Sequence, residues 1–214
     1  MFCYFFIQNH TQMYKVFFKR KPLILTTSKK IIRDSEILID SKSSNYNILI
    51  SALKSKKNKS VLYFNSDPYL LIKHFEKCFS IVEAAGGMVV NENNEYLMIF
   101  RNDKWDLPKG HLKKNELNLE GASRELTEET GVKNLSPILI LPSTYHFIKK
   151  NKIYKLKKTR WFLFHSSFKG ELIPQSSEGI VKAEWKTKKE IKNCMTKMYP
   201  NIKELFDIHF YQSL

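Results

Sequence analysis

Residues 110–132 read GHLKKNELNLEGASRELTEETGV, and three glutamates stand within five positions of this stretch. Glu125, Glu128 and Glu129 follow the spacing i, i+3 and i+4, which gathers side chains on one face of a helix. Like charges at these spacings repel each other by roughly a few tenths of a kcal/mol per pair. A hard cation such as Mg²⁺ offsets the repulsion, because carboxylate oxygens bind it. The pattern indicates either a metal site or a solvated acidic helix face.

The whole stretch follows a longer spacing, G-x5-E-x7-R-E-U-x-E-E-x-G-U, in which U is apolar. Its positions are filled by Gly110, Glu116, Arg124, Glu125, Leu126, Glu128, Glu129, Gly131 and Val132. This pattern resembles the Nudix box at every fixed position. A given residue type occupies a position with a frequency of roughly 5–7%, so a chance match of the whole pattern is negligible. The apolar run at 84–90 and the loop WDLPKGH at 105–111 extend the resemblance.

The resemblance implies an α/β fold over residues 81–214, an α/β/α sandwich around a mixed sheet. Its expected strands include 84–90, 96–101, 138–141, 145–149 and 159–165, and Gly131 is expected to end the box helix. Residues 13–80 predict a separate small α+β unit, with strands at 14–18, 23–26, 36–39 and 61–64 and helices at 47–53 and 67–78. Residues 1–12 are expected to be an unstructured extension or to follow a misassigned start codon.

By resemblance, Glu128 and Glu129 are the main Mg²⁺ ligands, with Mn²⁺ as the alternative metal. Glu125 is a further ligand or the base that activates water. A metal held there neutralises a pyrophosphate and lowers the pKa of a bound water. Gly110 brings its backbone close to a phosphate or the metal.

Arg124 and Glu116 are expected to pair and hold the loop on the helix, a role that a purely structural salt bridge would also fill. The box departs from its commonest form at two positions. Gly121 replaces the usual Ala, and Leu117 stands where Ser or Thr often caps the helix, so we expect Asn118 to be the cap.

The loop WDLPKGH resembles that of diadenosine polyphosphate hydrolases, and also those of some 8-oxo-dGTP and diphosphoinositol polyphosphate hydrolases. Lys109 is therefore either a phosphate contact or a surface lysine. His111 is a candidate contact to a phosphate or leaving group. Trp105 is a candidate base-stacking residue, although a core position is favoured, and Tyr145 belongs either to the substrate pocket or to the core.

Nudix enzymes often use one more glutamate from a late loop, and Glu178 lies in such a loop, flanked by Ser and Gly. It is the candidate general base or an additional metal ligand, with a solvated loop residue as the alternative. Glu184 fits a surface strand.

We therefore expect a cytoplasmic, magnesium-dependent pyrophosphohydrolase that cleaves a nucleoside diphosphate linked to another moiety. The loop favours a dinucleoside polyphosphate such as diadenosine tetraphosphate. The alternatives are hydrolysis of 8-oxo-dGTP or of RNA 5′-pyrophosphate, and a Nudix-fold regulator that only binds nucleotide or nucleic acid. A pure binder has no need to keep three mutually repelling glutamates.

The chain is strongly basic, with a net charge of +15. Residues 1–82 carry +9 and residues 83–214 carry +6, and neither half contains a dense basic tract. The charge fits an anionic partner such as nucleic acid, but an AT-rich coding sequence produces a similar excess of lysine.

Cysteine usage fits a reducing compartment, because Cys3, Cys78 and Cys194 are far apart and show no zinc spacing. The apolar opening MFCYFFI is too short to cross a bilayer and has no positive segment before it, so no membrane partner is expected.

Overall fold

The computed structural model describes residues 14–19, 21–29 and 33–212, so the predicted extension at 1–12 lies outside the described residues. The chain forms two compact units. Unit 1 contains residues 1–80 together with 147–156, and unit 2 contains residues 81–146 together with 157–214. The segment 147–156 is the tip of a hairpin whose remaining length belongs to unit 2.

In its described residues, unit 1 has four strands of a mixed sheet in the order β1-β2-β4-β3. The strands are β1 (Tyr14–Phe18), β2 (Lys21–Thr26), β3 (Glu36–Asp40) and β4 (Ser60–Phe64). β1 runs antiparallel to β2, whereas β2 and β3 both run parallel to β4. The four strands predicted in this part of the chain are confirmed, with β2 beginning two residues earlier than expected.

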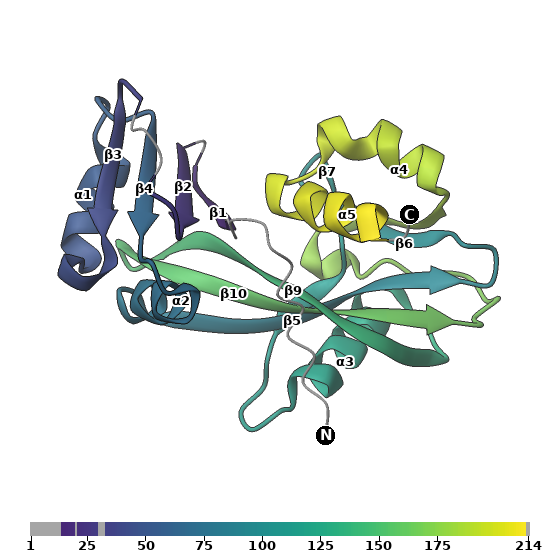
Figure 1. The fold of residues 1–214 in the computed structure, drawn as a ribbon. Coiled ribbons are helices and arrows are strands. Elements are labelled where there is room, and N and C mark those ends of the chain that lie inside the picture. The colour runs from purple at the N-terminus through teal and green to yellow at the C-terminus, as the bar shows by residue number, and fades with distance from the viewer. Residues whose placement is uncertain (1–13, 20, 30–32, 213–214) are drawn as a thin grey trace. The chain divides into compact units, whose positions relative to one another are not determined.

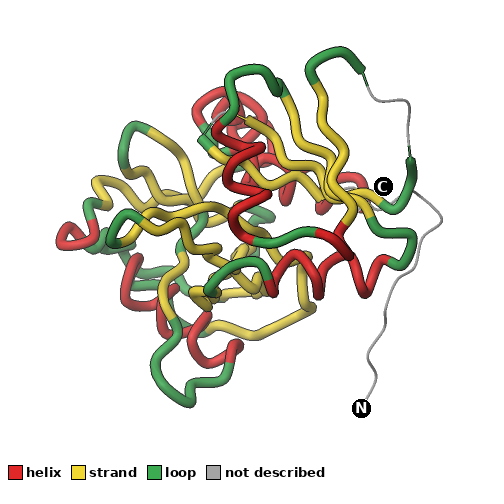
Figure 2. Tube along the Cα trace, turned by 90° about the vertical axis from the view of Figure 1, so that its left-hand side faces the viewer, coloured by secondary structure: helices red, strands yellow, loops and turns green. Residues whose placement is uncertain are grey.

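The described part of unit 1 also contains three helical segments: η1 (Ser41–Ser43), α1 (Tyr46–Lys54) and α2 (Pro68–Lys77). The side chain of Asp67 accepts hydrogen bonds from the backbone N–H groups of Tyr69 and Leu70, with Pro68 at the start of the helix. This cap satisfies donors that the first turn leaves unpaired. Figure 2 shows the helices, strands and loops of the chain in separate colours.

A long hairpin is formed by β9 (Leu135–Lys150) and β10 (Ile153–Ser166). Its turn consists of Asn151 and Lys152, whose φ angles are 51° and 65°, as a two-residue type I′ turn requires. The two short strands expected at 138–141 and 145–149 are therefore one continuous strand. At the tip, Phe147 packs on Phe18 and Phe79 with ring centroids 5.4 and 5.1 Å apart. These contacts explain why the tip belongs to unit 1.

Unit 2 carries the α/β/α sandwich (Figure 1). Its sheet has the order β11-β6-β5-β10-β9, with β7 paired to β6 and β8 paired to β5. The added strands are β5 (Ile81–Asn91), β6 (Tyr96–Arg101), β7 (Lys104–Asp106), β8 (Lys109–His111) and β11 (Ile180–Lys186). The helical segments are α3 (Asn118–Thr130), η2 (Ser176–Glu178), α4 (Lys188–Cys194), η3 (Met195–Lys197) and α5 (Pro200–Gln212).

Residues of β5 alternate between the two faces of this sheet. Ala85 and Val89 pack with Leu126 of α3, whereas Met88 packs in a separate core with Phe206 of α5. Figure 1 shows α3 on one face and α4 and α5 on the other. This arrangement confirms the predicted fold class.

Helix α3 ends as predicted and begins differently. Gly131 adopts a φ of 71° and its N–H bonds to the carbonyl of Thr127, a left-handed cap that glycine tolerates well. At the other end Leu117 is the cap residue and no side chain accepts a hydrogen bond there, while Asn118 is already helical. The predicted Asn118 cap is therefore wrong. Among the described helices, none is long and apolar enough to cross a membrane.

Candidate active site

Strand β8 and helix α3 meet at Gly110 and Glu125. A Cβ atom built on Gly110 would lie 1.9 Å from Oε2 of Glu125. A larger side chain at this position would displace the Glu125 carboxylate, so glycine allows the close approach between the β8 backbone and this group. The structure thus brings the loop glycine and the first glutamate of the cluster into direct contact.

Arg124 links three of the predicted acidic residues. Its Nε and Nη2 donate to the two oxygens of Glu116 at 2.6 and 2.9 Å. Its Nη1 donates to Glu125 Oε1 at 2.7 Å and to Glu128 Oε2 at 2.8 Å. The Arg124 hydrogen bonds, with one from the Lys113 backbone, lower the pKa of Glu116 from 4.5 to about 2. The charged pair ties the loop before α3 to the helix.

Glu129 lies in a different environment from Glu128. Its side chain is 2% exposed, whereas that of Glu128 is 44% exposed. One oxygen of Glu129 accepts from the backbone N–H of Lys109 at 2.9 Å, and the other lies 3.6 Å from Nη1 of Arg101. Burial raises the pKa of Glu129 to about 7, although the nearby cations oppose the shift. The inner end of the acidic face is therefore enclosed by protein.

Asp106 holds Arg101 and Lys109 at this enclosed end. The sequence did not indicate this role. Asp106 is buried and accepts hydrogen bonds from Nζ of Lys109 at 2.5 Å and from Nη2 of Arg101 at 3.3 Å. Lys109 is 6% exposed, so it is not a surface lysine. A phosphate contact by its ammonium group would compete with Asp106.

His146 and Lys157 form a second group that the sequence analysis did not identify. The two-residue turn pairs Lys150 with Ile153 and, counting back along the hairpin, places His146 opposite Lys157. Burial lowers the pKa of Lys157 to about 8 and that of His146 to about 4, and the positive charge of Lys109 adds to both shifts.

Lys157 makes no hydrogen bond or ion pair with any residue that the structure describes. The charges of Asp106 and Glu129 act on it, which places it near the enclosed end of the acidic face. The Asn-Lys turn could have revealed the register of the hairpin from sequence, but nothing in the sequence showed which face of the hairpin lies near Asp106 and Glu129.

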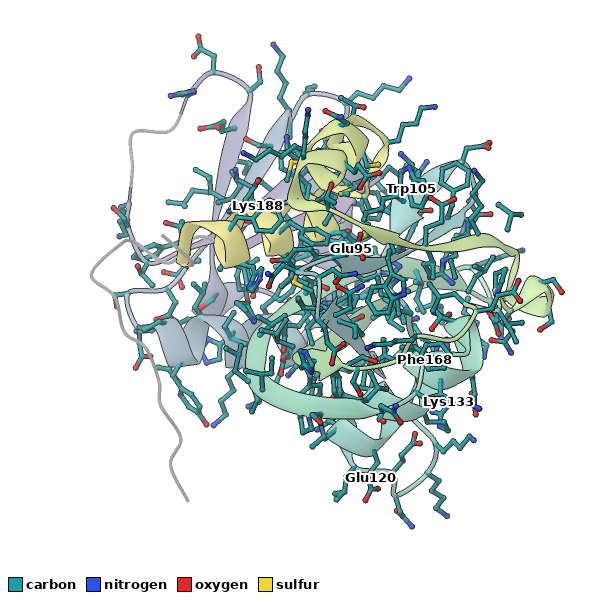
Figure 3. The ribbon with its side chains drawn as sticks, turned by 90° about the vertical axis from the view of Figure 1, so that its right-hand side faces the viewer. Glu95, Trp105, Glu120, Lys133, Phe168 and Lys188 are labelled. Atoms are coloured by element: carbon teal, nitrogen blue, oxygen red, sulfur yellow. The ribbon has the colours of Figure 1, made fainter. Side chains whose placement is uncertain are left out.

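The other residues predicted to bind substrate lie at separate places. Trp105 is half-buried beside the core of α5, with Phe100 at 4.9 Å and Nζ of Lys186 at 4.1 Å from its ring centroid. Figure 3 shows Trp105 beside the C-terminal helices and Glu120 of α3 on the other side of the sheet. The main-chain oxygen of His111 accepts from Nη2 of Arg124 at 3.0 Å, while its side chain is exposed.

Tyr145 is 6% exposed and precedes His146 on β9, so the two point to opposite faces. Glu178 is exposed in η2. Its loop is tied to the end of α3, because the N–H of Gln175 donates to the Glu129 carbonyl at 3.0 Å. The structure thus brings the loop of Glu178 to the end of the acidic helix, with the Glu178 side chain exposed.

A hollow of about 600 Å³ is lined by α3 together with residues of β9 and β10. Its wall is mainly apolar and includes Leu119, Leu135, Pro137 and Phe164. Arg124 and Glu128 also line it. A cavity next to the acidic face is therefore open to a ligand.

The carboxylates of Glu125, Glu128 and Glu129 are suitable ligands for a divalent cation. Among the described residues, no three acidic, histidine or cysteine side chains are gathered as a complete metal site. However, one nitrogen of Arg124 stands within 2.8 Å of both Glu125 and Glu128, so a single cationic group can bridge these carboxylates. Carboxylate oxygens are the ligands that Mg²⁺ prefers.

Comparison with known proteins agrees with this geometry. The family model of the NUDIX domain matches residues 81–207, which include β8, the acidic helix and the loop of Glu178. The chain belongs to the Nudix family. The match leaves most of unit 1 outside it.

Two curated Nudix relatives illustrate the range of the family. An RNA pyrophosphohydrolase of Bartonella henselae is 34% identical over 32% of this chain and 43% of its own. An 8-oxo-dGTP diphosphatase of Buchnera aphidicola subsp. Schizaphis graminum is 34% identical over 35% of this chain and 61% of its own. The chain thus spans less than two thirds of the curated relatives it matches.

Among solved Nudix structures, the MutT protein of Methanosarcina mazei Go1 has a similar fold. The TM-score is 0.50 at 21% identity, over 63% of this chain and 96% of that one. Because the sequence identity is only 21%, this similarity shows a shared fold alone.

Proposed function

We propose that unit 2 is a metal-dependent hydrolase of phosphoric anhydride bonds in nucleoside polyphosphates. The observation that carries the proposal is the bridging of Glu125 and Glu128 by one cationic nitrogen, with Glu129 enclosed beside them. Family membership and the complete box support the same reaction class. The metal is Mg²⁺, with Mn²⁺ as a substitute.

Glu125, Glu128 and Glu129 would hold the metal. When bound there, a divalent cation neutralises phosphate charge and acidifies a coordinated water. Arg124 would release Glu125 and Glu128 while keeping its two bonds to Glu116, so the loop stays on the helix. Gly110 lets the backbone of β8 approach Glu125.

The remaining groups bind the substrate and move the proton. Lys157, which has no partner among the described residues, would bind a phosphate of the polyphosphate chain, and His111 would lie near the leaving group. Glu178 would accept the proton of the attacking water, because its loop is attached to the end of α3. If Glu178 does not act, Glu125 takes the role of base.

The first candidate substrate is a dinucleoside polyphosphate such as diadenosine tetraphosphate, supported by the loop WDLPKGH. The second is RNA carrying a 5′-pyrophosphate, supported by the similarity to the Bartonella relative. The similarity to the Buchnera relative keeps 8-oxo-dGTP as a third.

The test is hydrolysis of these three substrates with Mg²⁺, with products identified by mass spectrometry. Glu128→Gln should lower turnover by about two orders of magnitude or more, since metal stabilisation of the transition state amounts to several kcal/mol. Glu171→Gln, which changes an exposed glutamate of unit 2 outside the lining of the hollow, is the matched control. Absence of hydrolysis for every substrate, with nucleotide binding retained, would favour a regulator that only binds.

A further inference from the structure

The positive charge of the chain is concentrated in unit 1. Its 90 residues contain 18 basic and 5 acidic residues, a net charge of +13. Unit 2 contains 18 basic and 16 acidic residues, a net charge of +2. The hairpin tip causes much of this difference, because it contributes four lysines and no acidic residue. A lysine excess that came from coding composition would affect both units alike.

Lysines from distant parts of unit 1 meet at Tyr154 on the hairpin tip. Nζ of Lys54, at the end of α1, lies 5.5 Å from the centroid of the Tyr154 ring, and Nζ of Lys149 lies 5.9 Å from it. Lys21 donates to the carbonyl of Ser55, the residue after Lys54. We call Lys21, Lys54, Lys149 and Tyr154 the Tyr154 cluster. Exposed lysines continue it along the chain at Lys56, Lys57, Lys150 and Lys152.

The Tyr154 cluster is held in place by packing. Tyr154 contacts Phe18 at 4.7 Å between ring centroids, and its N–H donates to the hydroxyl of Tyr46 at 3.1 Å. The lysines are thus presented from a sheet, a helix and a hairpin that pack on one another. A fixed surface of this kind presents its charges together to a partner.

Carboxylates do not neutralise this surface. Among the described residues, no carboxylate forms an ion pair with Lys21, Lys54 or Lys149. Glu36 bonds to the Ser60 hydroxyl and the Arg33 backbone, while Asp40 and Asp67 accept from backbone N–H groups. The accumulated lysine charge therefore calls for an external anion.

We propose that unit 1 binds a nucleic acid strand through its phosphate backbone, with the Tyr154 cluster as the contact surface. Many charges on one rigid surface suit a polymer of phosphates better than a single metabolite. A membrane fits less well, because the exposed large apolar side chains in the described part of unit 1, Ile48, Tyr69 and Ile153, lie on three separate elements. This function is independent of the hydrolysis proposed for unit 2.

The test measures binding of the full chain to fluorescein-labelled 20-nucleotide RNA and DNA by anisotropy. EDTA is present, so hydrolysis does not contribute. The logarithm of the association constant should fall with the logarithm of salt concentration with a slope of about −3 or steeper, as expected for four or more phosphate contacts on a single strand. Comparison of RNA with DNA identifies the preferred polymer.

The double variant Lys54→Glu, Lys149→Glu should weaken binding by about tenfold or more at 100 mM salt. The control variant Lys189→Glu, Lys192→Glu makes the same charge change on exposed positions of α4 in unit 2 and should stay within about twofold. Thermal melts verify folding, and Lys54→Gln, Lys149→Gln replaces the first variant if it does not fold.

Equal losses in both double variants would overturn the surface assignment, because net charge alone would then explain binding. Binding to phosphatidylserine vesicles that equals or exceeds binding to both oligonucleotides at the same salt would overturn the assignment of the partner. Glu128→Gln should bind the oligonucleotides normally, which separates this result from any failure of the proposed hydrolysis.

Discussion

Arg124 and Glu116 form a bidentate pair, with Nε to Oε1 at 2.6 Å and Nη2 to Oε2 at 2.9 Å. Parallel N–H···O bonds of this kind fix the relative orientation of two side chains as well as their distance. Eight residues separate the two along the chain, and the pair closes the loop before α3. The same guanidinium reaches Glu125 and Glu128, so the fold and the proposed site share one residue.

The Arg124–Glu116 pair should make stability depend on acid pH. The pKa of Glu116 is lowered to about 2 from 4.5, so the pair stabilises the fold fully above pH 4.5 and loses its effect as pH falls towards 2. Glu116→Gln should therefore lose less stability than the wild type between pH 4.5 and 2.5. Urea unfolding at several pH values measures this difference, and equal pH dependence in both proteins would refute the prediction.

Gly110→Ala should disturb the site more than the fold. The new Cβ would overlap the carboxylate of Glu125, which ends a flexible side chain and can move away. We expect turnover to fall about tenfold or more, since small displacements of catalytic groups have effects of this size, with little change in melting temperature. Unchanged turnover would mean that the position of Glu125 is not critical.

Lys157→Met should weaken binding of an anionic substrate and leave the chemical step nearly intact. Loss of a charge-assisted hydrogen bond predicts a KM raised about tenfold or more, with kcat within about threefold. Lys169→Met, which removes an exposed lysine elsewhere in unit 2, is the control.

The pH dependence of KM tests the same role of Lys157. Its pKa is lowered to about 8, so the ammonium is protonated below that pH and lost above it. KM of the wild type should rise as pH increases through 8, while Lys157→Arg should delay the rise because arginine stays charged. A wild-type KM that is flat from pH 7 to 9.5 would count against the contact.

Glu178→Gln should lower kcat by about 10²-fold or more with KM little changed, if Glu178 accepts the proton of the attacking water. Glu171→Gln, an exposed neighbour in the same connection, provides the control. If kcat of the Glu178 variant stays within about twofold, the role of base passes to Glu125.

Removal of residues 1–80 should not remove hydrolysis, because the proposed site lies in unit 2. The hairpin tip must be changed as well, since truncation alone would uncover Phe147 and Tyr154, which pack on residues of unit 1. We expect the simple truncation to aggregate. A truncation that joins His146 to Lys157 by Asn-Gly should be soluble and active, and a folded but inactive protein would refute the prediction.

Local patterns in the sequence predicted most secondary structure and the acidic helix. Gly131 ends α3, Asp67 begins α2, and the spacing of Glu125, Glu128 and Glu129 identified the family, because each of these signals acts within a few residues along the chain. The cap predicted at Asn118 was wrong, because Leu117 is the cap residue and Asn118 is already helical. No side chain caps that end, and the Arg124–Glu116 pair ties the preceding loop to the helix.

The sequence by itself determined the Nudix fold of residues 81–207 and the helix that carries Glu125, Glu128 and Glu129. Only the tertiary structure placed Lys109 on Asp106, brought Lys157 to the enclosed end of the acidic face and assigned the hairpin tip to unit 1. Each of these outcomes depends on which faces of distant strands meet. The free energy of such contacts comes from burying side chains far apart in the chain, so no local pattern encodes it.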